Sequence, residues 1–200
     1  MHSLSSSFVL GFHGCDREVA ESLLNGAPFT SSQNDWDWLG HGIYFWEVNP
    51  VRGLEFARIL QRWRAENGRL PQIREPYVIG AVVDLGFCLD LFSSSGTEAV
   101  ARAYGDFVAY CEEAGIPIPE NSGGTDLPYR NLDCAVINHL HNIRKQAGLP
   151  AFDSVKGPFI EGGTIYPGSG FRRKTHIQIC LRNLACIKGA FRVPDDQLEP

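Results

Sequence analysis

Alternating apolar positions near the start of the chain predict a β-strand over residues 6–14, SSFVLGFHG. The side chains of Phe8, Leu10 and Phe12 repeat every second residue and would share one face of the strand. His13 falls on the opposite face, at the end of this strand. A polar side chain therefore lies near the end of a strand whose central residues are apolar.

Apolar side chains spaced three or four residues apart predict four helices, over residues 16–26, 49–68, 97–115 and 131–148. Asp16 and Asn49 can each cap a helix, because their side-chain oxygens accept hydrogen bonds from backbone N–H groups of the first turn. Pro50 suits the first turn that follows Asn49.

Short apolar runs predict the remaining strands, over residues 42–47, 77–91, 154–163, 175–183 and 186–193. A turn at Gly86 would divide the second of these runs into two strands. Strands thus gather at both ends of the chain, with helices between them. This order is typical of an α+β domain whose sheet is completed by the C-terminal strands.

The composition is that of a globular protein, with 44% hydrophobic and 20% charged residues. Because the net charge is −5, no overall basic field attracts nucleic acid or an anionic membrane. No apolar run approaches the ~18 residues of a membrane span, and the N-terminus lacks the basic start of a signal peptide. The six cysteines show no CxxC spacing, so we expect reduced thiols in a cytoplasmic protein.

Two segments carry side chains that suit ligand binding. His13 is followed by Gly14, which would let a ligand approach the backbone closely. In GHGIYFW, Tyr44 alternates with Ile43 and Phe45 and could stack on a planar heterocycle. Each also has a structural explanation: a histidine with its hydrogen bonds satisfied at a strand end, and a half-buried aromatic ring.

A third such segment is THIQICL, near the C-terminus. Ile177, Ile179 and Leu181 would form its apolar face, and Gln178 would share the opposite face with His176. A buried amide without hydrogen-bond partners costs about 1–3 kcal/mol. Sugar hydroxyls could supply those partners, and so could neighbouring backbone.

Taken in order, these motifs resemble the ADP-ribosyltransferases of the diphtheria-toxin and PARP type. The matching features are FHG, then LGHGIYF about thirty residues later, then a helix with the pair Phe56-Ala57, then a late strand with a polar site residue. They cover the first 60 residues and residues 153–192. The resemblance implies one catalytic domain over residues 1–200, with split antiparallel β-sheets, flanking helices and a helical insertion at 92–150.

The resemblance also implies roles for individual residues. His13 is similar to the histidine that binds the adenosine-side ribose of NAD, and Gly14 to the glycine whose backbone pairs with the nicotinamide carboxamide. Tyr44 looks like the aromatic residue that stacks on the nicotinamide ring. Phe56 is the candidate for covering the other face of that ring or the edge of the pocket.

The glutamate that the family usually carries in its third motif is absent. Thr175 could take its place by sequence, but strand parity favours Gln178, with His176 as the alternative. Without the glutamate's charge, the resemblance implies a mono-ADP-ribosyltransferase rather than a polymerase. Its catalytic residues would be Gln178, His13 and Tyr44, with the Gln178 amide oxygen on the ribose 2-hydroxyl as an oxocarbenium-like charge develops.

This hypothesis makes NAD a substrate, requires no metal and needs a macromolecular acceptor, for which we expect a protein ahead of a nucleic acid. Family analogy suggests a bacterial toxin or defence effector with an antitoxin or immunity partner, and no membrane partner. Two alternatives stay open. The missing glutamate would suit a catalytically silent module that binds NAD or ADP-ribose. The arginine bias, with only four lysines among 18 basic residues, would suit an enzyme that modifies nucleic acid.

Other polar groups carry weaker signals. His139 and His141 would lie on different faces of a helix, which argues against a metal site. The RRK sequence at 172–174 could meet a phosphate or form an exposed turn, and Glu161 could act as a base toward the acceptor.

Overall fold

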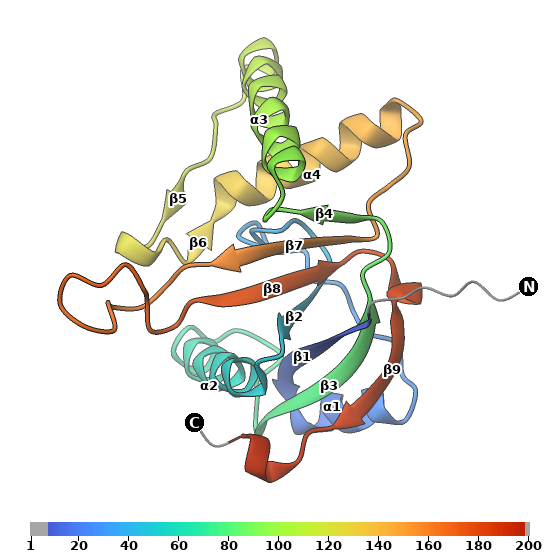
Figure 1. Ribbon diagram of the computed structural model, residues 1–200, viewed down its shortest axis with the longest axis vertical. Coiled ribbons are helices and arrows are strands. Elements are labelled where there is room, and N and C mark those ends of the chain that lie inside the picture. The colour runs from blue at the N-terminus through green and yellow to red at the C-terminus, as the bar shows by residue number, and fades with distance from the viewer. Residues whose placement is uncertain (1–7, 199–200) are drawn as a thin grey trace, which may run out of the picture. The chain divides into compact units, whose positions relative to one another are not determined.

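The computed structural model describes residues 8–198 and mixes α-helices with a mostly antiparallel β-sheet (Figure 1). The four helices are α1 (Arg17–Leu24), α2 (Pro50–Glu66), α3 (Ser94–Ala114) and α4 (Asn131–Gln146). The strands are β1 (Phe8–Asp16), β2 (Ile43–Glu47), β3 (Pro76–Asp84), β4 (Cys88–Asp90), β5 (Asn121–Ser122), β6 (Tyr129–Arg130), β7 (Ser154–Phe159), β8 (His176–Leu181) and β9 (Ile187–Arg192). Three short 3-10 helices, η1 (Gly124–Asp126), η2 (Leu184–Cys186) and η3 (Asp195–Gln197), complete the described chain.

The α+β class predicted from the sequence is confirmed, and so are the four helices and their caps. The Asp16 side chain accepts from the backbone N–H of Glu18, and Asn49 accepts from that of Arg52. Gly86, at φ 57°, separates β3 from β4 as expected. The first strand is longer than predicted at its C-terminal end, because the ladder with β3 continues as far as Asp16; residues 6 and 7 lie outside the described part.

The described chain divides into two compact units, each assembled from separate stretches of sequence. The first comprises residues 8–30, 44–85 and 183–198, and the second comprises residues 31–43 and 86–182. The single domain with an insertion at 92–150 therefore stays a prediction.

In the first unit, strands pair antiparallel in the order β2-β1-β3-β9. Helices α2 and α1 cover opposite faces of this sheet. On the α2 side, Phe12 and Leu54 belong to one buried cluster; on the α1 side, Cys15 and Leu23 belong to another. Residues 12 and 15 of one strand differ in parity, which is why their side chains reach different helices.

Gly14 brings helix α2 and strand β1 into close contact. A Cβ atom at Gly14 would lie 2.0 Å from the backbone oxygen of Gly53 on α2. A side chain there would push the helix off the sheet, so the packing of α2 already accounts for a glycine at this position.

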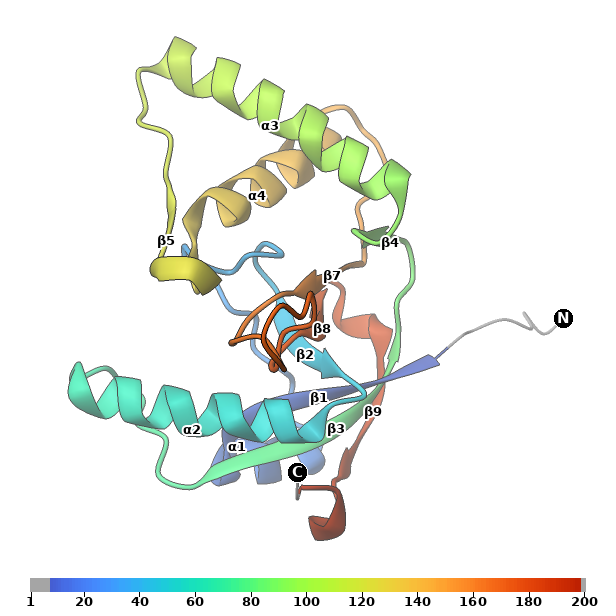
Figure 2. The ribbon, with the colours of Figure 1, turned by 60° about the vertical axis from the view of Figure 1, so that its left-hand side comes forward.

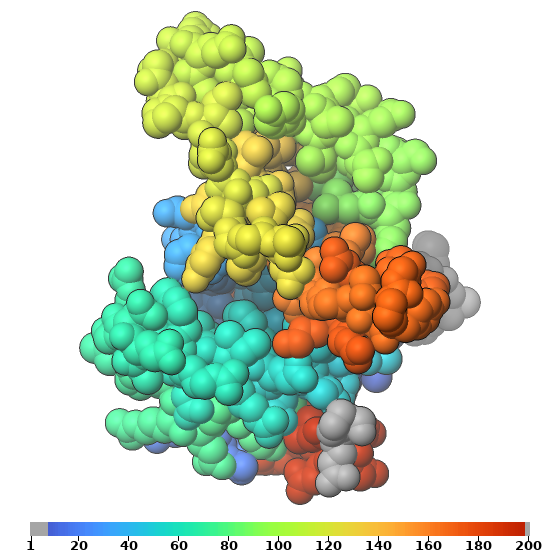
Figure 3. Space-filling model, turned by 90° about the vertical axis from the view of Figure 1, so that its left-hand side faces the viewer, coloured from blue at the N-terminus to red at the C-terminus, as the bar shows by residue number. Residues whose placement is uncertain are grey.

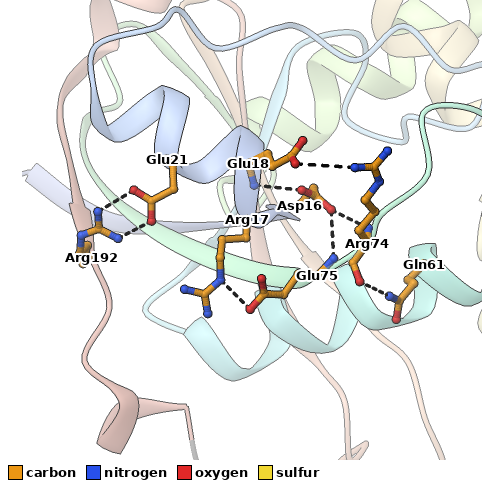
Figure 4. A network of polar contacts seen from close by, with 8 residues as sticks. All are labelled: Asp16, Arg17, Glu18, Glu21, Gln61, Arg74, Glu75 and Arg192. Carbon is orange, nitrogen blue, oxygen red and sulfur yellow. Dashed lines mark hydrogen bonds and ion pairs between the residues drawn. The ribbon is translucent and has the colours of Figure 1, made fainter.

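A network of charged side chains ties α1 to the sheet of the first unit (Figure 4). Asp16 accepts from three backbone N–H groups: Glu18 at 2.9 Å, Arg74 at 2.6 Å and Glu75 at 3.1 Å. On the same helix, Glu21 meets the guanidinium of Arg192 on β9 through two contacts of 2.6 Å. Asp16 thus acts as a helix cap and as a tether for the start of β3.

The second unit pairs β4 with β7 in parallel and β7 with β8 antiparallel. Helices α3 and α4 pack against each other, and their axes cross at an angle in both ribbon views (Figure 2). A two-stranded ladder of β5 and β6 precedes α4. The predicted insertion therefore contains the α3–α4 pair.

Both sides of β8 are covered, including the side that parity assigns to its polar residues. Ile179 and Leu181 are fully buried on one face, but so is Cys180 on the other, and His176 is buried as well. A Cβ atom at Gly42 would lie 2.5 Å from Cys180 Sγ and 2.6 Å from the Leu181 carbonyl oxygen. The bare backbone at Gly42 thus packs closely against β8 at Cys180.

All six cysteines are thiols, and five of them are buried. Burial raises the pKa of Cys15 to about 12 and that of Cys134 to about 11, so both stay protonated at neutral pH. Among residues 8–198, no helix combines the length and the hydropathy of a membrane-crossing segment.

Candidate functional site

The first unit holds His13 in one orientation. Its Nδ1 lies 2.9 Å from the backbone oxygen of Tyr44, and its ring lies 5.6–5.7 Å from the rings of Phe45 and Phe29. A carbonyl oxygen only accepts hydrogen bonds, so Nδ1 carries the proton and Nε2 is an acceptor in the neutral ring. Burial lowers the pKa of His13 below 6.5, against the smaller opposing effect of the Tyr44 hydrogen bond. The imidazole is therefore neutral near pH 7.

A pocket of about 380 Å³ lies beside His13, on the α1 side of the sheet. Its wall combines the His13 and Phe29 rings with polar groups from Glu18, Ser22 and Thr30. The volume falls within the range of small-molecule sites, which pair apolar walls with a few polar groups. Phe29 comes from the loop that follows α1, so that loop shapes the pocket.

Tyr44 and Gly14 lie on the other side of this sheet from His13. Phe12 is paired with Trp46 across β1 and β2, so Trp46 faces the α2 side. Alternation along β2 puts the Tyr44 side chain on the same side as Trp46, as the sequence predicted, and puts Phe45 on the His13 side. His13 thus contacts the backbone of Tyr44 and not its phenol.

Phe56 lies on the α2 side and is 39% exposed. Its ring centroid is 4.9 Å from that of Trp46, with the planes tilted by 41°. The candidate for the edge of the nicotinamide pocket therefore shares one side of the sheet with Tyr44, and its ring packs on a buried tryptophan.

In the second unit, Gln178 is held by Trp38. The indole Nε1 donates a hydrogen bond to Gln178 Oε1 over 2.6 Å. An indole N–H can only donate, so this contact fixes which end of the amide is oxygen. Gly157, paired with Gln178 across β7 and β8, makes room for the indole: a Cβ at Gly157 would lie 2.9 Å from the Trp38 ring.

Aromatic and charged groups surround this pair. The Phe159 ring meets Trp38 edge-on at 5.3 Å and stacks on His176 at 5.5 Å. The Arg130 guanidinium lies 4.4 Å from the Phe159 ring centroid and 5.3 Å from that of Trp38. His176, the alternative for the third motif, is buried, and its Nδ1 lies 2.7 Å from the Lys174 carbonyl oxygen. It is therefore part of the support around Gln178.

Glu161, the candidate base, lies at the edge of this cluster. One of its carboxylate oxygens is 3.9 Å from His176 Nδ1. His139 of α4 packs against Phe107 and Tyr110 of α3, so it serves the helix pair. Across residues 8–198, the histidine, cysteine and acidic side chains form no cluster of three that could hold a metal.

Helix α4 anchors the loop that carries Trp38. The Asn138 side-chain oxygen accepts from the backbone N–H of His41 at 3.1 Å. Asp37 is buried and accepts from the backbone N–H of Asn34 at 2.8 Å, and burial raises its pKa despite that bond. The predicted insertion thus has a structural role, because one of its helices fixes the loop that orients Gln178.

Sequence reasoning missed the partners of both polar residues. It assigned no role to Phe29 or Arg130 and did not link Trp38 to Gln178. The bond between Trp38 and Gln178 joins residues 140 positions apart. The strand pattern does not contain that information, and the available signal was that three of the four tryptophans gather at positions 36, 38 and 46.

Comparison with known proteins adds little. An uncharacterized protein of Methanocaldococcus jannaschii is 35% identical over 72 residues, which are 36% of this chain. The aligned stretch spans 31% of that protein's own length. No protein-family model matches the chain, and no solved structure matches it significantly.

Proposed function

We propose that the protein is an NAD-dependent mono-ADP-ribosyltransferase, which transfers ADP-ribose from NAD to a macromolecular acceptor and releases nicotinamide. The observation that carries the proposal is the neutral, oriented His13 imidazole beside a pocket of about 380 Å³. The finer fold, with split ADP-ribosyltransferase-like sheets, belongs to the same proposal.

The tautomer of His13 suits a ribose hydroxyl. With Nδ1 donating to the Tyr44 carbonyl oxygen, Nε2 presents a lone pair to a hydroxyl donor. The polar groups of Ser22 and Thr30 and the ring of Phe29 line the same pocket. Hydroxyls and an aromatic wall suit the sugar and base of an adenosine.

The nicotinamide half would lie on the α2 side. His13 and Tyr44 sit where the β1–β2 pair ends, so one dinucleotide could pass over that end of the sheet. Its adenosine would then meet His13, and its nicotinamide would meet Tyr44, with Phe56 nearby on the same side. A bent NAD of this kind holds the scissile bond away from the adenosine anchor.

The resemblance gives Gln178, in the second unit, the role of a polar partner for the nicotinamide-side ribose. Its Oε1 has two lone pairs, and Trp38 uses one, which leaves the other for the ribose 2-hydroxyl. A carbonyl dipole whose direction is fixed before reaction stabilises a developing positive charge without reorganising. Because an amide dipole is weaker than a carboxylate, we expect slower chemistry than in a glutamate enzyme.

The reaction breaks the N-glycosidic bond of NAD. The bonding electron pair leaves with the nicotinamide nitrogen, and the cationic pyridinium becomes a neutral ring. The acceptor nucleophile forms a bond to the ribose C1 and loses a proton to a base. Glu161 is the candidate for that base. We retain a cytoplasmic effector with an antitoxin or immunity partner as part of this proposal.

The test uses the purified full chain, NAD labelled in the adenosine half, and cell lysate. We expect label to enter a macromolecule with release of nicotinamide. Gln178→Ala should lower the rate about 10²-fold, as for loss of one preorganised polar contact. His13→Ala should weaken NAD binding. Gln33→Ala and His139→Ala serve as matched controls and should leave the rate near that of the wild type.

The outcomes separate the alternatives. NAD binding without transfer of label would favour the silent module and reject the transferase. Absence of both binding and turnover in a folded protein would reject NAD as the ligand. Digestion of the labelled product with protease or nuclease identifies the class of acceptor.

A further inference from the structure

Residues 160–175, between β7 and β8, form an ordered hairpin. Thr164 and Arg172 pair as an antiparallel bridge, and the Ile165 N–H donates to the Phe171 carbonyl oxygen at 3.2 Å. The turn is closed by the Ser169 N–H, which donates to the Tyr166 carbonyl oxygen at 3.0 Å. The segment therefore presents its side chains from a fixed backbone.

This hairpin exposes large apolar side chains. Phe171 is 67% exposed and Tyr166 is 55% exposed, and Ile160 and Ile165 are exposed as well. The orange residues of the segment form a lobe on the face shown in Figure 3. Aromatic rings this exposed gain little from burial within the chain, so they are available to stack on a partner.

The same hairpin is locally basic in an acidic chain. Arg172, Arg173 and Lys174 follow Phe171 directly, and the one acid of the segment, Glu161, lies beside His176. Each arginine donates one N–H hydrogen bond to a backbone oxygen of the hairpin, Arg172 to Gly162 and Arg173 to Ile165, both over 3.2 Å. Each guanidinium has five N–H donors, so each is held in place with donors to spare for a phosphate.

We propose that this hairpin binds single-stranded nucleic acid, through base stacking on Tyr166 and Phe171 and phosphate contacts to Arg172, Arg173 and Lys174. Stacking rings beside a basic track are what a single strand requires. Screening reduces the effect of charges beyond about 8–10 Å, so the local cations govern the contact despite the net charge of −5. This inference does not rest on the proposed function.

An anionic membrane would also attract exposed rings and cations. The apex of the hairpin, however, is Pro-Gly-Ser-Gly over residues 167–170, with no large apolar side chain to enter a lipid layer. The rings flank the turn instead, where they can stack on bases. Paired arginines also favour bidentate phosphate contact.

The test measures fluorescence anisotropy of labelled single-stranded RNA and DNA of about 16 nucleotides with the full chain. We expect binding that the double variant Tyr166→Ala/Phe171→Ala weakens about tenfold or more. The variant Arg173→Ala/Lys174→Ala should weaken binding. It should also reduce the slope of log affinity against log salt concentration by about 0.7 for each lost phosphate contact. Tyr104→Ala/Tyr110→Ala, which removes two exposed rings of α3, is the matched control and should bind as the wild type does.

Thermal unfolding of each variant shows whether it is folded. If the aromatic variant does not fold, the charge variant and the salt dependence of the wild type decide. Absence of binding by the wild type would overturn the proposal, and so would equal binding by the wild type and the folded hairpin variants. Binding to vesicles of phosphatidylcholine and phosphatidylserine without binding to nucleic acid would assign the hairpin to a lipid surface and reject it. Loss of NAD turnover alone would leave this result unchanged.

Discussion

The indole N–H of Trp38 donates a hydrogen bond to the side-chain oxygen of Gln178 over 2.6 Å. The two residues belong to the same compact unit, although helices α2, α3 and α4 all lie between them in sequence. This bond gives the amide a single orientation, and it makes Trp38 a positioning residue in the proposed reaction.

Trp38→Phe should lower kcat for nicotinamide release about fivefold while KM for NAD changes little. The substitution keeps an aromatic ring but removes the donor, whose net worth is about 1 kcal/mol. The double variant Trp38→Phe/Gln178→Ala should be no slower than Gln178→Ala alone, because the indole acts through the amide. Equal losses in both backgrounds would contradict the coupling, and Trp36→Phe, at an exposed position, is the control.

The pH dependence of NAD affinity should follow the fraction of His13 that is neutral. Burial lowers the pKa of His13 below 6.5, so NAD affinity should stay constant as pH falls from about 8 to about 6.5 and decline only below that value. His13→Gln retains a donor and an acceptor without titrating, so its acid decline should disappear. If the NAD affinity of the wild type began to decline at about pH 7.5, His13 would not be the titrating group.

His13 should also make the free energy of unfolding fall as the pH falls. Because its folded pKa is depressed, the unfolded chain binds the proton first. The contribution is complete above 6.5 and is lost as pH falls through the folded pKa. Denaturant unfolding at several pH values should show a smaller loss over this window in His13→Gln.

Asp16→Ala should destabilise the protein by about 2 kcal/mol, and Asn49→Ala by about 1 kcal/mol. Both residues cap a helix of the first unit, but Asp16 accepts from three backbone N–H groups and the Asn49 cap from one. Burial alone would raise the pKa of Asp16, and these hydrogen bonds lower it overall. Its contribution should therefore be full above about pH 3.8 and fall away below, as chemical denaturation in acid would measure.

Gly42→Ala should cost about 1–3 kcal/mol, because the added Cβ would lie 2.5 Å from Cys180 Sγ and 2.6 Å from a backbone oxygen. Gly105→Ala is the contrasting variant. Nothing lies within 4 Å of a Cβ there, and an alanine inside α3 should stabilise by about 0.5–1 kcal/mol. Thermal unfolding that moved in the same direction for both variants would contradict the close packing at Gly42.

The sequence predicted the four helices, the caps of α1 and α2 and the longer strands because these depend on local spacing, but it did not predict β5 and β6. The capping roles of Asp16 and Asn49 follow from their side chains and from the helical sequence directly after each of them. The pattern also placed Tyr44 on the side of β2 opposite Phe45. It could not show that Cys180 lies under Gly42, because an apolar thiol fits either a covered or an open face.

The surroundings of the candidate site were harder to predict than the site residues themselves. Phe29 lies in a loop without periodicity, and Arg130 reaches Trp38 and Phe159 through contacts between distant segments. Gly14 was expected for a ligand's sake, yet the backbone of Gly53 already requires it. Close packing between elements follows from their arrangement, and strand or helix patterns do not encode that arrangement.

The pairing of β3 with β9 sets the order in which the two units can be completed during synthesis. Ile79 is partnered by Arg192, so the edge strand of the first unit is synthesised after every segment of the second unit. The pieces of the second unit, by contrast, have all been made once residue 182 has left the ribosome. A nascent chain can therefore complete the second unit before the first. Strands β1 and β3 are made early, but their sheet is complete only when β9 has been synthesised.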